Sequence, residues 1–295
     1  MSVESVSLAR DALAGTDDLV IPDYAGYSLS NLLPSAIAAV GQGGEDLLGL
    51  PRCRRICVLL VDGLGSSVLR AGISEAPFFR RALADQLDNA EVTTGRLTAG
   101  FPSTTGASLA SIGTGLPPSR HGLVGYRVLI PEHGRLMSLL QWDDAVDPSD
   151  WQPHPTVFEQ LADAGISSAH VASSAYESSG LTRAAFRGAR YVSSFTPGDL
   201  IANIAQVSVE VPLVFGYYAD LDQTGHGVGV DSEAWRHQLA IVDRMLERLV
   251  TALPADTALV VTADHGMVDV SEAGKRDVDA DPSLREGVAL VGGEA

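Results

Sequence analysis

The stretch VLLVDGLG, residues 58–65, joins an apolar, β-branched run to an aspartate and two glycines. Such a run is typical of a strand that is buried on both faces of a parallel sheet. The stretch LVVTADHG, residues 259–266, has the same design and contains Asp264 and His265. Because ligands gather at the carboxyl ends of strands in α/β sheets, the two stretches predict an α/β fold with Asp62, Asp264 and His265 at one edge.

Carboxylate and imidazole groups at this predicted edge form the pattern of a divalent metal site. Buried carboxylates cost several kcal/mol each unless a cation offsets their desolvation. The segment DQTGH adds Asp222 and His226, which are four residues apart and share one face of a helical turn. Any single Asp-Gly or Asp-His pair is more typical of a turn or a helix cap. The three motifs together favour two divalent ions.

The segment GFPSTTGASLASIGTG, residues 100–115, supplies a candidate nucleophile. Pro102 and Ser103 indicate a helix start, and the small residues that follow predict a helix packed closely on the sheet, with Thr105 in its first turn. Free backbone N–H groups and the helix dipole favour a phosphate there. A metal lowers the pKa of a coordinated hydroxyl and so activates it as a nucleophile. The alternative is that Ser103, Thr104 and Thr105 are only N-cap residues.

With these motifs in this order, the chain resembles the alkaline phosphatase superfamily, and most closely its nucleotide pyrophosphatase/phosphodiesterase branch. The resemblance covers roughly residues 55–266. In that family a Thr-Gly pair lies nine residues after the nucleophile, and Thr114-Gly115 has this spacing from Thr105. The resemblance therefore implies an alkaline-phosphatase-like fold with Thr105 as the nucleophile.

The resemblance also assigns the motif residues to two zinc ions. Four ligands would hold the first ion: Asp62, Thr105, Asp264 and His265. Asp222 and His226 would hold the second, which in the family takes a further His near the C-terminus. This sequence has no His after His265. We therefore expect the chain to be truncated at its C-terminus, and the second zinc site to be incomplete.

A further departure from the family concerns Tyr126, which lies twenty-one residues after Thr105. Phosphodiesterase relatives have an Asn here that binds a phosphoryl oxygen. A phenol donates one hydrogen bond, so Tyr126 is a candidate substrate-binding residue. A structural aromatic at the start of the next hairpin is an equally good interpretation.

Alternating strand and helix signals predict a single α/β domain over residues 1–295, with a mostly parallel central sheet flanked by helices. The apolar spacing of residues 233–252 predicts a helix that covers one face of the sheet. Residues 127–153 predict a small hairpin followed by an acidic loop, which we interpret as an insertion. It either caps the substrate or packs on the edge of the sheet.

Composition limits the partners of the chain. A formal net charge of −17 argues against a nucleic-acid-binding surface. No run reaches the roughly eighteen apolar residues of a membrane helix, and the N-terminus lacks the order of a signal peptide. The two cysteines match no zinc motif, so a cytoplasmic location is expected. Outside the motifs, four histidines are expected at the surface or in loops: His133, His154, His170 and His237.

These observations predict a zinc-dependent hydrolase of small phosphate esters, with nucleotides among the candidate substrates. The favoured activity is that of a phosphodiesterase or nucleotide pyrophosphatase that acts through a phosphothreonine intermediate on Thr105. A phosphomonoesterase or phosphonate hydrolase on the same scaffold is the first alternative. A metal-binding protein with weak activity is the second, if the second zinc site is incomplete. The oligomeric state stays open.

Overall fold

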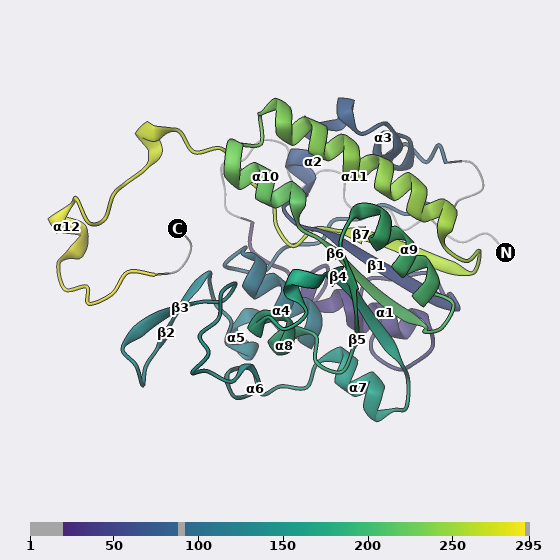
Figure 1. Cartoon of the computed structure of the whole chain (residues 1–295), viewed down its shortest axis with the longest axis horizontal. Coiled ribbons are helices and arrows are strands. Elements are labelled where there is room, and N and C mark those ends of the chain that lie inside the picture. The colour runs from purple at the N-terminus through teal and green to yellow at the C-terminus, as the bar shows by residue number, and fades with distance from the viewer. Residues whose placement is uncertain (1–19, 88–91, 293–295) are drawn as a thin grey trace.

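The computed structural model describes residues 20–87 and 92–292 (Figure 1). Its centre is a five-stranded sheet with the strand order β5-β4-β6-β1-β7, and every pair of neighbouring strands is parallel. The strands are β1 (Arg55–Val61), β4 (Ser168–Ser173), β5 (Arg190–Ser194), β6 (Leu213–Tyr218) and β7 (Thr257–Thr262). The sequence-based prediction of a mostly parallel sheet in an α/β fold is confirmed.

Strand β1 lies between β6 and β7, and its residues from Ile56 onward are buried. Leu60 is in register with Tyr217 on β6 and with Thr262 on β7. The three strands therefore end at the same edge of the sheet. Within the described part of the chain β7 pairs only with β1, so it is an edge strand.

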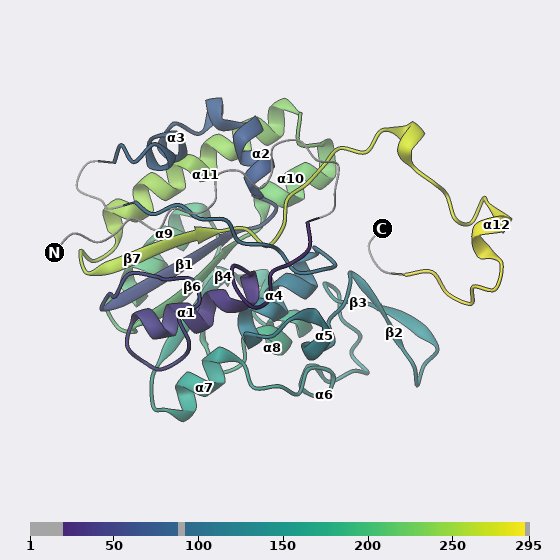
Figure 2. The same cartoon turned by 180° about the vertical axis from the view of Figure 1, so that it is seen from behind.

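Helices cover both faces of the sheet, as the two opposite views show (Figures 1 and 2). One face packs against α2 (Ser66–Ala71), α3 (Pro77–Leu83), α9 (Pro197–Val207), α10 (Asp220–Val228) and α11 (Glu233–Ala252). The other packs against α1 (Leu32–Ala39), α4 (Thr105–Thr114), α7 (Val157–Asp163) and α8 (Gly180–Ala185). Shorter helices are α5 (Pro118–His121), α6 (Pro148–Trp151) and α12 (Pro282–Arg285). The observed α11 has the bounds that its apolar spacing predicts.

Helix α4 is buried along its whole length, as its run of small residues predicts. A Cβ atom on Gly113 would lie 1.8 Å from the Ala185 carbonyl oxygen of α8, so only glycine permits this close approach. The helix ends at Gly115, whose φ of 71° places it in the left-handed region that glycine adopts without strain. Tight packing thus fixes the position of the helix that begins at Thr105.

The predicted insertion contains a hairpin of β2 (Arg127–Ile130) and β3 (Arg135–Ser138). Leu139, directly after β3, is fully buried and donates its backbone N–H to the Tyr126 carbonyl oxygen. A Cβ atom on Gly106 would lie 2.9 Å from Leu139 Cδ1. The base of the hairpin therefore packs on the first turn of α4, beside Thr105, rather than on an edge strand of the sheet.

The C-terminal part of the described chain, residues 271–292, extends away from the sheet and carries mostly exposed side chains (Figures 1 and 2). Residues 288–292 form no strand. Residues 293–295 lie outside the described residues. No described helix combines the length and the apolar character that a membrane span requires.

His170 departs from its expected surface position, because it lies in β4 and is buried. Its ring stacks on Phe186 and Phe215, with centroid separations of 4.4 and 5.4 Å. Burial lowers the pKa of His170 to about 3. In the unfolded chain a histidine has a pKa of about 6.5, so as the pH falls the unfolded state binds a proton first. His170 therefore makes the folded state lose stability on acidification.

We expect this loss to reach about 1.4 kcal/mol per pH unit as the pH falls from the unfolded pKa toward the folded one. His170→Leu removes the titrating group, so the free energy of unfolding should depend less steeply on pH by that amount. Urea unfolding of both proteins at neutral pH and near pH 5 measures the two slopes. Equal slopes would show that folding does not lower the pKa of His170.

Candidate metal centre and nucleophile

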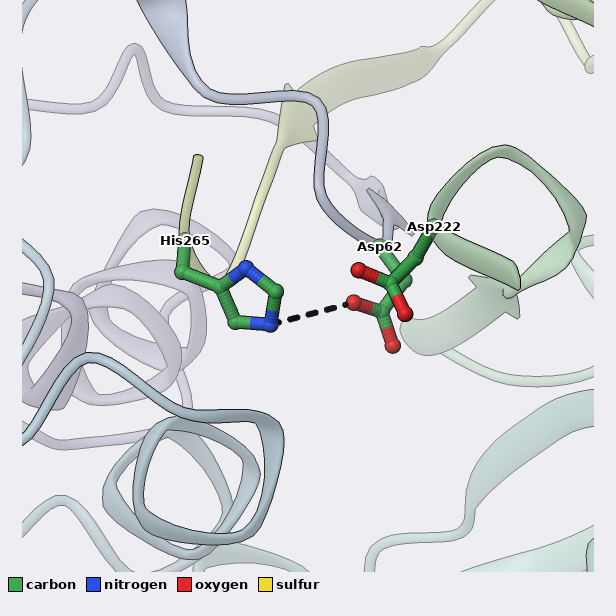
Figure 3. Close-up of side chains that lie close together, drawn as sticks. All are labelled: Asp62, Asp222 and His265. Carbon is green, nitrogen blue, oxygen red and sulfur yellow. Dashed lines mark ion pairs between the residues drawn. The ribbon is translucent and has the colours of Figure 1, made fainter. Parts of the chain in front are cut away.

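Three of the predicted metal ligands converge at the carboxyl edge of the sheet. Asp62, Asp222 and His265 each offer one ligand atom, and these atoms lie within 4.8 Å of one another (Figure 3). Asp62 follows β1, Asp222 lies in the first turn of α10, and His265 follows β7. The cluster therefore assembles because three neighbouring strands end together.

The imidazole of His265 is oriented to offer one nitrogen to the cluster. Its Nδ1 lies 3.0 Å from the carbonyl oxygen of Gly266. Because a carbonyl only accepts, Nδ1 is the donor in this contact, and in the matching neutral tautomer Nε2 is an acceptor. Nε2 lies 3.4 Å from Asp62 Oδ1 and 3.4 Å from Asp264 Oδ2. This is the arrangement of a metal-binding histidine that is held by a backbone carbonyl.

Asp264 is fully buried and is fixed by backbone donors. Its Oδ1 accepts from the N–H of Gly63 at 3.1 Å and from that of His265 at 3.0 Å. Gly63 has a φ of 72°, and a Cβ atom there would lie 2.9 Å from Asp222 Oδ1. The glycine after Asp62 is therefore needed both for its backbone conformation and for the approach of Asp222.

One oxygen of each carboxylate has no hydrogen-bond partner in the described part of the chain: Asp62 Oδ1, Asp222 Oδ1 and Asp264 Oδ2. Burial, followed by the charges of Asp264 and Asp222, raises the pKa of Asp62 well above its usual range. Burial also raises the pKa of Asp222. Unpaired buried carboxylate oxygens beside the acceptor nitrogen of an imidazole fit a divalent cation, which would supply the missing partner.

Thr105 is the first residue of α4, and its Oγ1 lies 3.1 Å from His265 Nε2. Since Nε2 is the acceptor, the Thr105 hydroxyl donates to it. The N-cap residue is Thr104, whose side chain makes no capping hydrogen bond. Among the described hydrogen bonds, it is therefore Thr105 that joins α4 to His265.

Two other predicted site residues, His226 and Tyr126, are more exposed to solvent than the buried carboxylates. The His226 side chain is 73% exposed, and its Nε2 lies 3.6 Å from Asp222 Oδ2. Tyr126 is half-buried, its ring lies 5.9 Å from the Arg127 guanidinium carbon, and no hydrogen bond of its hydroxyl is found among the described residues. The carboxylate of Asp269 accepts hydrogen bonds from the backbone N–H groups of Val230 and Asp231, so it is bonded to the loop after α10.

A model of the type I phosphodiesterase/nucleotide pyrophosphatase family matches residues 56–290 of this sequence. The chain belongs to this family. The match spans every motif discussed above, and it confirms the resemblance that the motifs indicate. A search of the curated proteins returned no significant match.

Solved structures of this family and of a phosphonate hydrolase share the fold. An inactive threonine-to-alanine variant of murine ectonucleotide pyrophosphatase/phosphodiesterase 5, in complex with AMP, superimposes with a TM-score of 0.62 at 22% identity, over 77% of this chain and 60% of that one. Phosphonoacetate hydrolase from Sinorhizobium meliloti 1021, in complex with phosphonoacetate, gives 0.56 at 20% identity, over 81% and 63%. The chain thus spans about three fifths of the length of these relatives.

Two residues beside the centre of this family member were not anticipated from its sequence. The Tyr217 hydroxyl donates to Asp62 Oδ2. Ser108 Oγ donates to the backbone carbonyl of Asp264 at 2.9 Å. Tyr217 lies on a different strand from Asp62, so only the strand register reveals the pair. Ser108 could have been predicted from the sequence, because it lies three residues after Thr105 and so shares its face of the helix.

Ser108 joins α4 to the loop that carries Asp264 and His265. Ser108→Ala removes the hydroxyl donor and leaves a buried carbonyl oxygen without it, so we expect the free energy of unfolding to fall by about 1–3 kcal/mol. Urea unfolding of the metal-free protein measures this loss. A change below about 0.5 kcal/mol, which is typical of surface substitutions, would show that the hydrogen bond contributes little.

Proposed function

We propose that this chain is a zinc-dependent hydrolase of small phosphate esters, and that it cleaves phosphodiesters or nucleotide pyrophosphates through a phosphothreonine on Thr105. The observation that carries the proposal is the position of the Thr105 hydroxyl, which lies 3.1 Å from His265 Nε2 inside a cluster of buried carboxylates. A nucleophile at the N-terminus of a ten-residue helix also faces free backbone N–H groups, which suit phosphoryl oxygens.

Two zinc ions are proposed, in keeping with the family motifs. Asp62, Thr105, Asp264 and His265 would hold one, and Asp222 and His226 the other. Bound zinc would lower the pKa of the Thr105 hydroxyl and offset negative charge on the phosphoryl group. Asp222 offers an oxygen within 4.8 Å of ligand atoms of Asp62 and His265, so an ion held by Asp222 would lie beside the first.

In the proposed reaction, the Thr105 oxygen forms a bond to phosphorus while the bond from phosphorus to the leaving-group oxygen breaks. Helix α4 holds Thr105 in place, and its first backbone N–H groups orient the phosphoryl oxygens. Water then attacks the phosphothreonine, which frees the phosphoryl product and returns the Thr105 hydroxyl. Residues 127–153 are proposed as an insertion that lies beside the nucleophile.

The related structures support a phosphate or phosphonate substrate. The murine relative binds AMP, and its threonine-to-alanine variant is inactive. The bacterial relative is a phosphonoacetate hydrolase. The latter supports the second candidate function, which is hydrolysis of a phosphonate or a phosphomonoester on the same scaffold.

Turnover of bis-p-nitrophenyl phosphate, p-nitrophenyl phosphate and phosphonoacetate by the zinc-loaded protein separates these functions. A clear diester preference supports the proposal. Preference for the monoester or the phosphonate selects the second candidate. Turnover of none of the three would favour a metal-binding protein with weak activity.

Tyr126 is proposed to donate a hydrogen bond to a non-bridging phosphoryl oxygen. We expect Tyr126→Phe to lower turnover roughly tenfold to a thousandfold, the range for loss of one preorganised donor. Tyr126→Asn is the companion variant, because it restores the residue of phosphodiesterase relatives and should change the ratio of diester to monoester turnover. Steady-state kinetics of both variants test the role, and an unchanged rate for Tyr126→Phe would make the ring purely structural.

A further inference from the structure

Among the described residues, Tyr217 donates a hydrogen bond from its phenol to the carboxylate of Asp62. It contacts Oδ2, whereas Oδ1 has no hydrogen-bond partner among the described residues. Oδ1 is the atom that lies 3.4 Å from His265 Nε2. The two oxygens of Asp62 therefore have different roles, one bound to a protein donor and one free at the centre of the cluster.

We propose that Tyr217 is a positioning residue, which selects the Asp62 oxygen presented to the metal. This inference rests on the metal centre of the proposed function. Asp62 is 2% exposed, so water does not compete for Oδ2. A phenol is protonated at neutral pH and donates a single hydrogen bond. With Oδ2 engaged, the carboxylate is held with Oδ1 toward His265 Nε2, although Asp222 and Asp264 repel its charge.

The Tyr217 ring is itself fixed by a second tyrosine. Tyr176, which follows β4, packs edge-on against it, with ring centroids 5.7 Å apart and planes at 71°. The Tyr176 hydroxyl accepts a hydrogen bond from Gln223 Nε2 at 2.9 Å. Gln223 is the neighbour of Asp222 on α10. Two tyrosines thus connect the elements that carry Asp62 and Asp222, and so hold the two carboxylates in a common frame.

Outer hydrogen-bond partners of metal ligands change metal affinity by about 10–100-fold when they are removed. Tyr217→Phe keeps the ring and its contact with Tyr176 but removes the donor. We expect the Kd for zinc, measured by competition with a chromophoric chelator, to rise by about that factor. Because the coordination geometry should relax as well, we also expect the visible spectrum of the cobalt-substituted protein to change.

Tyr218→Phe is the matched control, since it also removes one hydroxyl from β6. The Tyr218 hydroxyl accepts from Gln238 Nε2 at 2.7 Å and is not hydrogen-bonded to a carboxylate of the cluster. This variant should keep the zinc affinity and the cobalt spectrum of the unaltered chain. Tyr176→Phe, which loses only the contact with Gln223, should have an intermediate or negligible effect on affinity.

Thermal unfolding without metal separates positioning from a general loss of stability. The proposal requires that Tyr217→Phe lose zinc affinity while its metal-free melting temperature stays close to that of Tyr218→Phe. If Tyr217→Phe does not fold, 4-fluorophenylalanine at position 217 fills the same volume without a donor. The role of Tyr217 would be overturned if Tyr217→Phe, or the 4-fluorophenylalanine variant, had the zinc affinity and the cobalt spectrum of the unaltered chain. Failure of the unaltered chain to bind zinc or cobalt would instead reject the metal centre itself.

Discussion

Replacement of Thr105 by alanine is expected to lower phosphodiester turnover by roughly 10⁴–10⁶-fold, the scale seen when a covalent nucleophile is removed. No other hydroxyl is described in contact with His265 Nε2, so nothing in the described chain would substitute for it. Steady-state rates of the zinc-loaded variant measure the loss. Thr105→Ser, which keeps a hydroxyl at the same place, should retain much of the activity.

Thr104→Ala is the control for this prediction, because Thr104 is also buried and adjacent but makes no capping hydrogen bond. It should lose far less activity than Thr105→Ala. Mass spectrometry of an acid-quenched reaction should locate the phosphoryl group on Thr105. A phosphoryl group on Thr104 or Ser103 would contradict both the spacing argument and the geometry of α4.

Removal of divalent metal is expected to abolish hydrolysis, and added zinc should restore it. In the proposed centre, metal removal would take away the charge that activates Thr105, while three carboxylates keep unpaired oxygens. After dialysis we expect about one zinc ion per chain, because four ligands are proposed for the first site and only two for the second. Metal analysis alongside turnover measures both quantities.

Two substitutions test that unequal binding. Asp264→Asn should lose the tightly held ion, because Asp264 is fully buried and lies 3.4 Å from His265 Nε2. His226→Ala should keep it, since the His226 side chain is mostly exposed and contacts only Asp222 among the cluster. Two tightly held ions in the unaltered chain would mean that a further side chain completes the second site.

The sequence indicates those parts of the centre that follow from local rules. A buried strand that ends in aspartate places Asp62 and Asp264 at one edge, whatever the order of the strands. The first turn of a helix places Thr105. The two aspartates needed only the apolar strand pattern and the placement of strand ends. Thr105 was placed by the helix start at Pro102 and Ser103, and its selection as nucleophile rests on the family resemblance.

Other features depend on pairings between distant segments, which periodicity does not encode. Tyr217 reaches Asp62 because β6 neighbours β1 in a particular register. Leu139 fills the space above Gly106 because the hairpin folds back on α4. His170 is buried because β4 lies inside the sheet, between β5 and β6. The expected surface position was wrong because it rested only on the polarity of histidine.

Asp264 and His265 lie just after β7, which is one of the two edge strands of the described five-stranded sheet. β7 is held to the sheet through β1 alone, so its local opening should require less free energy than that of the inner strands. A cation bound by His265, Asp62 and Asp222 would link the end of this edge strand to the end of β1 and to α10. Local opening of β7 and release of the ion would then be thermodynamically linked, so that a bound ion stabilises β7 in the sheet.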